Sequence, residues 1–190
     1  LGGDMIARGY REPDDELAWR VGIEVPEDGE QRAQHIVPLS NLSVATSGDY
    51  RNYFEVDGQR YSHTINPRDG KPITHDLVSV SVFHPSNAWA DAWATALLVV
   101  GTEEGMALAL EHDLNVLLLV RDGDRWRSIA SPAFKDYFGD TLLEELGIDA
   151  ATRDKLREYE QAAEDDLALD LGVAQERRLV SRRLRRQPQV

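Results

Sequence analysis

The chain has 190 residues, of which 42% are hydrophobic and 29% charged, the balance of an ordinary folded domain. Its formal net charge of −13 argues against a general nucleic-acid binder, because contact with phosphates needs a basic surface. The absence of cysteine excludes disulfides, thiolate metal sites and a cysteine nucleophile. The sequence has no run of about 18 apolar residues, the length that a membrane-spanning helix needs.

The first half of the chain reads mainly as strands and turns. Residues 1–10 begin without methionine and run from apolar to turn-forming residues, so we expect an N-terminally truncated sequence. A strand is predicted over 15–26, because apolar residues alternate there and Pro26 ends the run. The alternating residues are Trp19, Val21, Ile23 and Val25. The polar segment 27–35 is expected to be a loop, and 36–48 a second apolar strand region.

The strongest hairpin signal is residues 52–65, where two aromatic or β-branched runs flank Asp57 and Gly58. Asp-Gly supplies the positive φ angles of a type I′ turn. Residues 66–72 read as a loop from their proline and glycine content. Residues 77–84 alternate as a strand.

The pattern then changes to helices. Residues 86–101 read as a helix, with Ser86 or Asn87 as the N-cap and Gly101 after its last turn. A second helix is predicted over 102–113, and a hairpin around Asp122 and Gly123 over 114–131. We therefore expect an α/β (α+β) fold, a largely antiparallel sheet packed with helices.

The composition shifts after residue 138, so we divide the chain into a domain over 1–138 and a helical extension over 139–190. The extension ends in the strongly basic segment 176–190. This segment is interpreted as a solvated, frayed helix end. The alternative is a contact with anionic lipid or with an acidic partner.

Asp91 and Thr95 are four residues apart on the predicted helix and should share one face. A carboxylate and a hydroxyl are hard oxygen ligands that suit Mg²⁺. The alternative is that Asp91 is an ordinary helix acid and Thr95 a surface hydroxyl.

His63, between a strand and a proline-containing loop, could act as a general base or be structural. The other four histidines show no metal-ligand spacing. The small-residue segments 45–50, with Ser47 and Gly48, and 1–4 could let backbone approach a ligand, although turns explain them equally well.

Four blocks in order, residues 1–9, 19–26, 44–72 and 90–101, resemble successive motifs of the bacterial ApbE family, over about residues 1–138. Its members are FAD:protein FMN transferases, first described as thiamine-biosynthesis lipoproteins. The resemblance implies a T-fold-like domain that binds FAD and Mg²⁺.

The resemblance also implies roles for individual residues. Asp91 and Thr95 match the family's metal ligands, and His63 matches the residue thought to activate the acceptor hydroxyl. Ile65 matches a position near the flavin, and Ser47 and Gly48 match the turn beside the cofactor. One departure is Asn66, where the family has aspartate, and we expect its role to be structural.

The expected activity is transfer of FMN from FAD to a threonine or serine of a target flavoprotein, with release of AMP. The alternatives are an FAD pyrophosphatase that forms FMN and AMP, and an inactive flavin-binding fragment. The family places the protein outside the cytoplasm, anchored to the membrane by an N-terminal segment, with acceptors in membrane redox complexes. We expect that anchor, part of the FAD pocket and a helix carbonyl ligand of the metal to belong to a missing N-terminal half.

Overall fold

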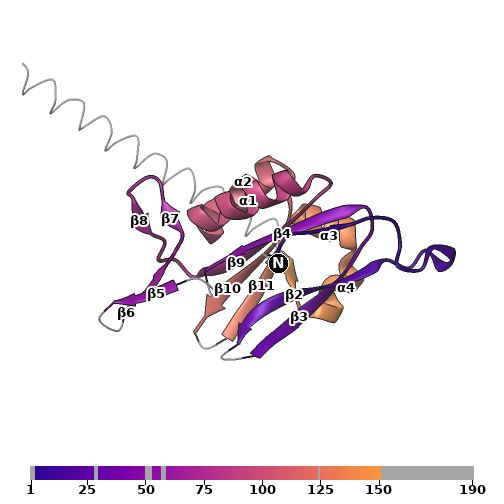
Figure 1. The fold of residues 1–190 in the computed structure, drawn as a ribbon, viewed down its shortest axis with the longest axis horizontal. Coiled ribbons are helices and arrows are strands. Elements are labelled where there is room, and N and C mark those ends of the chain that lie inside the picture. Colours follow the sequence, from indigo (N-terminus) through magenta and orange to yellow (C-terminus); the bar gives the residue numbers. More distant parts are fainter. Residues whose placement is uncertain (1–2, 28–29, 50–52, 57–58, 124, 151–190) are drawn as a thin grey trace, which may run out of the picture.

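Figure 1 shows the chain as a computed structural model, which describes residues 3–27, 30–49, 53–56, 59–123 and 125–150. Its main sheet has six strands in the order β1-β4-β9-β10-β11-β12. Their bounds are Met5–Ala7 (β1), Leu42–Gly48 (β4), Leu77–His84 (β9), Asn115–Asp122 (β10), Arg125–Ala130 (β11) and Asp149–Ala150 (β12). All neighbours are antiparallel except β11 and β12. The predicted fold class is confirmed.

The central strand β9 spans the segment predicted from its alternation, but both of its faces are buried. The alternation arises because valines facing the helices are interleaved with the small residues Ser79 and Ser81. Ser81 Oγ lies 2.8 Å from Thr46 Oγ1 on β4, so these two hydroxyls satisfy each other. This contact helps to fix β4 beside β9, and the last residues of β4 lie at the candidate site.

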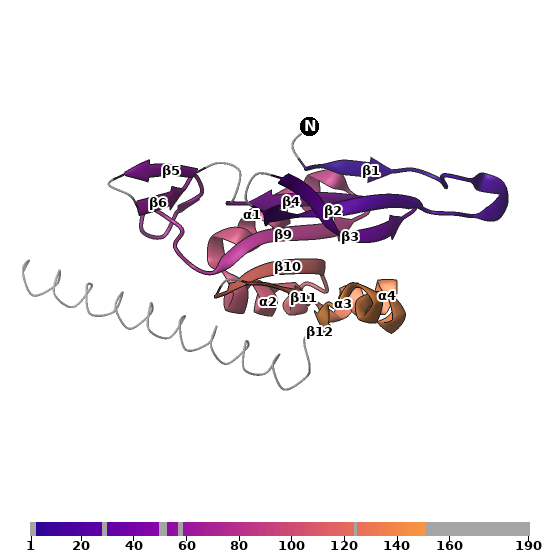
Figure 2. The ribbon, with the colours of Figure 1, turned by 90° about the horizontal axis from the view of Figure 1, so that it is seen from below.

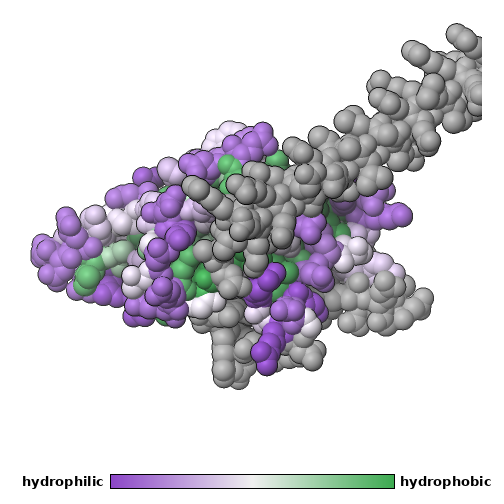
Figure 3. All heavy atoms as spheres, turned by 180° about the vertical axis from the view of Figure 1, so that it is seen from behind, coloured by the Kyte–Doolittle hydropathy of each residue, from purple (hydrophilic) through white to green (hydrophobic). Residues whose placement is uncertain are grey.

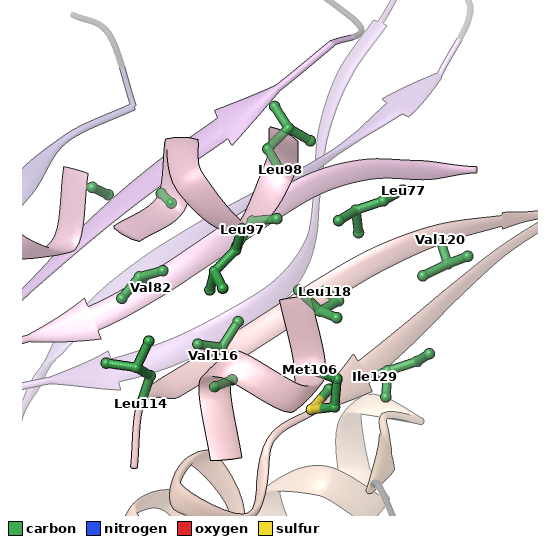
Figure 4. Packing of buried hydrophobic residues seen from close by; sticks show 14 of the residues in the cluster. Leu77, Val82, Leu97, Leu98, Met106, Leu114, Val116, Leu118, Val120 and Ile129 are labelled. Atoms are coloured by element: carbon green, nitrogen blue, oxygen red, sulfur yellow. The ribbon is translucent and has the colours of Figure 1, made fainter. Parts of the chain in front are cut away.

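Two helices cover one face of the sheet: α1 (Asn87–Val100) and α2 (Thr102–Glu111), as predicted. Ala90 and Ala94 are completely buried, and their small side chains let α1 lie close to the sheet. Figure 4 shows Leu97 and Leu98 of α1 and Met106 of α2 among apolar side chains of the strands. This core fixes α1, which carries Asp91 and Thr95, against the sheet.

The opposite face packs against the hairpin of β2 (Trp19–Glu27) and β3 (Glu30–Leu39), with α3 (Pro132–Phe138) and α4 (Asp140–Leu146). Figure 2 shows the hairpin running along the sheet and the two helices grouped at one end. Phe83 of β9 meets the rings of Phe134 and Phe138 edge-on, with centroids 5.4 and 5.3 Å away. The sheet therefore lies between two apolar layers.

Smaller elements extend beyond these layers (Figure 1). β5 (Tyr53–Val56) and β6 (Gln59–Ser62) form the predicted hairpin, although its turn lies outside the described residues. β7 (Ile65–Asn66) and β8 (Lys71–Pro72) form a second, very short hairpin within the segment predicted as a loop. A 3₁₀ turn, η1 (Pro13–Asp15), precedes β2.

The prediction of a loop over 27–35 is wrong. β2 continues to Glu27 and β3 begins at Glu30, so most of the polar segment is paired strand. Pro26 does not end β2, since it lies opposite Gln31. Each strand of a two-stranded ribbon has one unpaired edge, where the missing N–H of a proline is tolerated.

The C-terminal helix prediction is wrong at residues 147–150. α4 ends at Leu146, and residues 149–150 pair in parallel with β11. Leu143 and Ile148 are buried with Phe134, so this stretch packs with the preceding domain. The division at residue 138 stays a prediction, because residues 151–190, including the basic end, lie outside the described residues. Sequence analysis also missed β1 and α3.

Hydrophilic residues cover most of the face seen in Figure 3, and hydrophobic ones appear towards its middle. None of the helices within the described ranges has the length and apolar character that crossing a membrane requires.

Candidate functional site

The end of β4 meets α1 at a pair of hydroxyl groups. Ser47 Oγ lies 3.0 Å from Thr95 Oγ1, a hydrogen bond in which either group can donate. Ser47 points to the helix side of the sheet because Ala45, two residues earlier on β4, belongs to the core under α1. Gly48, the last residue of β4, is partly buried beside it. The structure thus brings three of the predicted residues together.

Asp91 lies one helical turn before Thr95 on the same face of α1, as their spacing predicts. Its side chain is exposed, whereas the neighbouring Ala90 is buried under the helix. The carboxylate is therefore open to solvent, one helical turn before the contact of Thr95 with Ser47.

A second carboxylate, Asp4, lies near Asp91 and was missed by sequence analysis. The pKa of Asp4 is raised above its ordinary value, mainly by partial burial and further by the negative charge of Asp91. Gly3 allows this approach: its φ is +90°, and a Cβ there would stand 3.1 Å from the Thr46 carbonyl oxygen. The two glycines before Asp4 were the available signal, since small residues there let backbone approach a ligand, but they do not single out the carboxylate.

The donor set fits Mg²⁺. The carboxylate of Asp91, with Asp4 nearby, and the hydroxyls of Thr95 and Ser47 are hard oxygen groups. Within the described ranges, no group of three or more His, Cys, Asp or Glu residues could hold a metal ion. Mg²⁺ typically takes one or two protein carboxylates and fills its other positions with water and substrate phosphate oxygens.

His63 directly follows β6 and is held in a local turn. Ser62 is buried, and its Oγ accepts a hydrogen bond from the Thr64 N–H at 3.1 Å. This bond joins the two residues on either side of His63. The His63 side chain itself is exposed. An exposed imidazole on a braced backbone is suited to proton transfer with a ligand.

Ile65 begins β7, which packs against α1, and its side chain is 47% exposed. The next residue, Asn66, accepts a hydrogen bond at Oδ1 from the Arg68 N–H at 2.9 Å. An aspartate could accept the same bond, so the local turn gives a physical reason for the structural role expected of Asn66. The segment with His63 and Ile65 thus lies on the side of the sheet that carries α1.

Three of the other four histidines make contacts elsewhere. His35 is buried, and its Nε2 lies 2.7 Å from Ser128 Oγ. His84 Nδ1 accepts from the Ser86 N–H at 2.9 Å, the residue before α1, and the His112 ring packs on Trp93. These three histidines lie in separate parts of the described structure.

The comparison with protein families shows to which family the chain belongs. The model of the ApbE family matches residues 1–118, well over half of the chain. This chain belongs to the ApbE family. The family resemblance inferred from the sequence motifs is confirmed.

Named relatives agree with this membership. The FAD:protein FMN transferase of Escherichia coli (strain K12) is 41% identical over 137 residues, covering 72% of this chain and 38% of the relative. The Vibrio cholerae transferase is 42% identical over 137 residues, covering 72% and 40%. The chain thus spans about two fifths of the length of the curated ApbE relatives that it matches.

Solved structures of ApbE proteins share the fold. The apo form of the Pseudomonas stutzeri flavinyl transferase ApbE is 44% identical with a TM-score of 0.61, covering 73% of this chain and 42% of that one. The flavin transferase ApbE of Vibrio cholerae is 39% identical with a TM-score of 0.60, covering 72% and 42%.

Proposed function

We propose that this chain supplies the Mg²⁺ site and the general base of an FAD:protein FMN transferase. The observation that carries the proposal is the contact of Ser47 with Thr95, one helical turn from Asp91, in a chain of the ApbE family. The names of the relatives supply the reaction class. The whole reaction is proposed for the longer proteins that this chain partly matches.

Asp91 and Thr95 would hold the ion, and Ser47 would orient the Thr95 hydroxyl through their hydrogen bond. When bound, Mg²⁺ supplies neutralisation of the pyrophosphate charge and stabilisation of the AMP leaving group. Asp4 adds negative charge next to Asp91, which favours a divalent cation at this place.

His63 would take the proton from the acceptor hydroxyl as its oxygen attacks the phosphorus that belongs to FMN. A new bond forms between that oxygen and phosphorus, while the bond from the same phosphorus to the bridging oxygen of the pyrophosphate breaks. AMP leaves with the bridging oxygen, and the proton remains on the imidazole. Ile65, half-exposed two residues later, would contact the flavin.

The partners follow from the same proposal. FAD is the substrate, and the acceptor is a flavoprotein subunit of a membrane redox complex outside the bacterial cytoplasm. The localisation rests on family resemblance.

The first experiment is a calorimetric titration of FAD into this chain, with and without Mg²⁺. Metal-dependent binding is expected if the chain carries a usable part of the pocket. Incubation with FAD, Mg²⁺ and an acceptor protein, followed by mass spectrometry, then tests transfer. An acceptor that gains the mass of FMN supports transfer, whereas free FMN beside an unmodified acceptor supports the FAD pyrophosphatase instead.

A further inference from the structure

Arg68 and Glu104 form a two-pronged ion pair between the β7–β8 hairpin and α2. Arg68 Nη1 lies 2.7 Å from Glu104 Oε2, and Nη2 lies 2.5 Å from Oε1. Exposed ion pairs usually contribute little, but parallel guanidinium–carboxylate bonds are the strong form of this interaction. The Glu104 side chain is 24% exposed and the Arg68 side chain 50%, so solvent screening is limited at the Glu104 end.

Residues 62–73, here called the base loop, are braced as a unit. Ser62 Oγ accepts from the Thr64 N–H at 3.1 Å, and the Thr64 carbonyl accepts from the Ile73 N–H at 3.0 Å. At the tip, Asn66 Oδ1 accepts from the Arg68 N–H. A shift at Arg68 would therefore be transmitted to the segment that carries His63.

Glu104, in contrast, belongs to the rigid part of the molecule. α2 follows α1 directly after Gly101, and both helices share one apolar core with the sheet. Asp91 and Thr95 are on α1, so their positions relative to Glu104 are set by that core. The base loop joins that core at Ile73, and β7 contacts α1, but most side chains between Ser62 and Ile73 are exposed, so the core fixes the middle of the loop less firmly.

We propose that the Arg68–Glu104 ion pair is a latch that sets the position of His63 and Ile65 relative to Asp91 and Thr95. Arg68 and Glu104 would then be positioning residues for flavin transfer, a role that rests on the proposed function. The latch would connect the loop that carries His63 to Asp91 and Thr95 through the packing of α2 on α1.

The test compares Glu104→Gln with Glu103→Gln in this chain and in a longer ApbE protein that contains it. Glu103 is exposed in the same first turn of α2, so both substitutions remove one charge from the same helix end. The first readout is hydrogen exchange of the Gly70 and Ile73 amides, whose hydrogen bonds close the base loop. Glu104→Gln should speed their exchange on the order of tenfold, and Glu103→Gln should not.

The second readout is steady-state flavin transfer. Glu104→Gln should lower kcat about tenfold with Mg²⁺ affinity unchanged, because the metal ligands on α1 do not move. The exchanged pair Arg68→Glu with Glu104→Arg should restore both slow exchange and kcat.

Equal exchange rates and equal kcat in the Glu104→Gln and Glu103→Gln variants would overturn the latch. Loss of Mg²⁺ affinity in Glu104→Gln would also overturn it, since this would place the effect on the metal site. If the wild-type longer protein transfers no flavin, the proposed function fails, and the exchange readout still decides whether the ion pair holds the loop.

Discussion

At the scale of single residues, His63 carries the acid–base part of the proposal. Replacing it with alanine should lower the rate of flavin transfer by about 10²–10⁴-fold, the usual contribution of a general base. FAD binding should persist, because the proposed metal ligands on α1 are untouched. Transfer is measured by mass spectrometry of the acceptor and binding by calorimetry. An unchanged transfer rate would reject His63 as the base.

Asp91 is the proposed carboxylate ligand of Mg²⁺. Asp91→Ala should greatly weaken Mg²⁺ binding and abolish activity, because Asp4 is then the one carboxylate left among the proposed groups, beside the neutral hydroxyls of Thr95 and Ser47. Calorimetric titration of Mg²⁺ measures the first effect independently of catalysis. Asp113→Ala, which removes an exposed carboxylate just after α2, is the control and should bind Mg²⁺ like the wild type. Wild-type activity of Asp91→Ala would reject the site.

At the scale of elements, the junction of α1 and α2 depends on Gly101. Its φ is +87°, and a Cβ there would stand 3.0 Å from His75 Cδ2. Gly101→Ala should therefore lower the free energy of unfolding by about 1–3 kcal/mol, measured by urea denaturation. Gly139→Ala separates backbone strain from the steric clash with His75, because Gly139 has a φ of +83° but nothing within 4 Å of an added Cβ. Equal losses in both variants would mean that only backbone strain matters.

At the scale of the whole molecule, His35 joins the β2–β3 hairpin to the main sheet. Its Nε2 meets Ser128 Oγ of β11, and its Nδ1 is buried without a hydrogen bond in the part of the chain that the structure describes. Burial lowers the pKa of His35 below its ordinary value. The folded state therefore favours the neutral imidazole. In the unfolded chain, His35 takes up a proton with its ordinary pKa of about 6.5.

The stability contributed by neutral His35 should be complete above about pH 6.5 and decline as the pH falls from there towards the lowered folded-state pKa. Urea denaturation between pH 7.5 and 5 would measure this as a decrease in the free energy of unfolding. Gln in place of His35 cannot take up the proton, so His35→Gln should show a flatter pH dependence. The same slope in both proteins would assign the effect to other groups.

The sequence by itself determined the elements whose signals are local. The segment 77–84 became β9, the segment 86–101 became α1, and the spacing of Asp91 and Thr95 placed them on one helix face. These features depend on residues a few positions apart, which is the range over which periodicity, caps and turn residues act. The ordered motifs also sufficed to indicate the ApbE family.

Only the tertiary structure decided which distant segments meet. The approach of Asp4 to Asp91, the contact of Ser47 with Thr95 and the Arg68–Glu104 pair each join residues from different elements. The same holds for the polar start of β3 and for β12, which are strands because a partner strand pairs with them. Such contacts depend on strand order, register and packing of the whole chain, and a local pattern does not specify these.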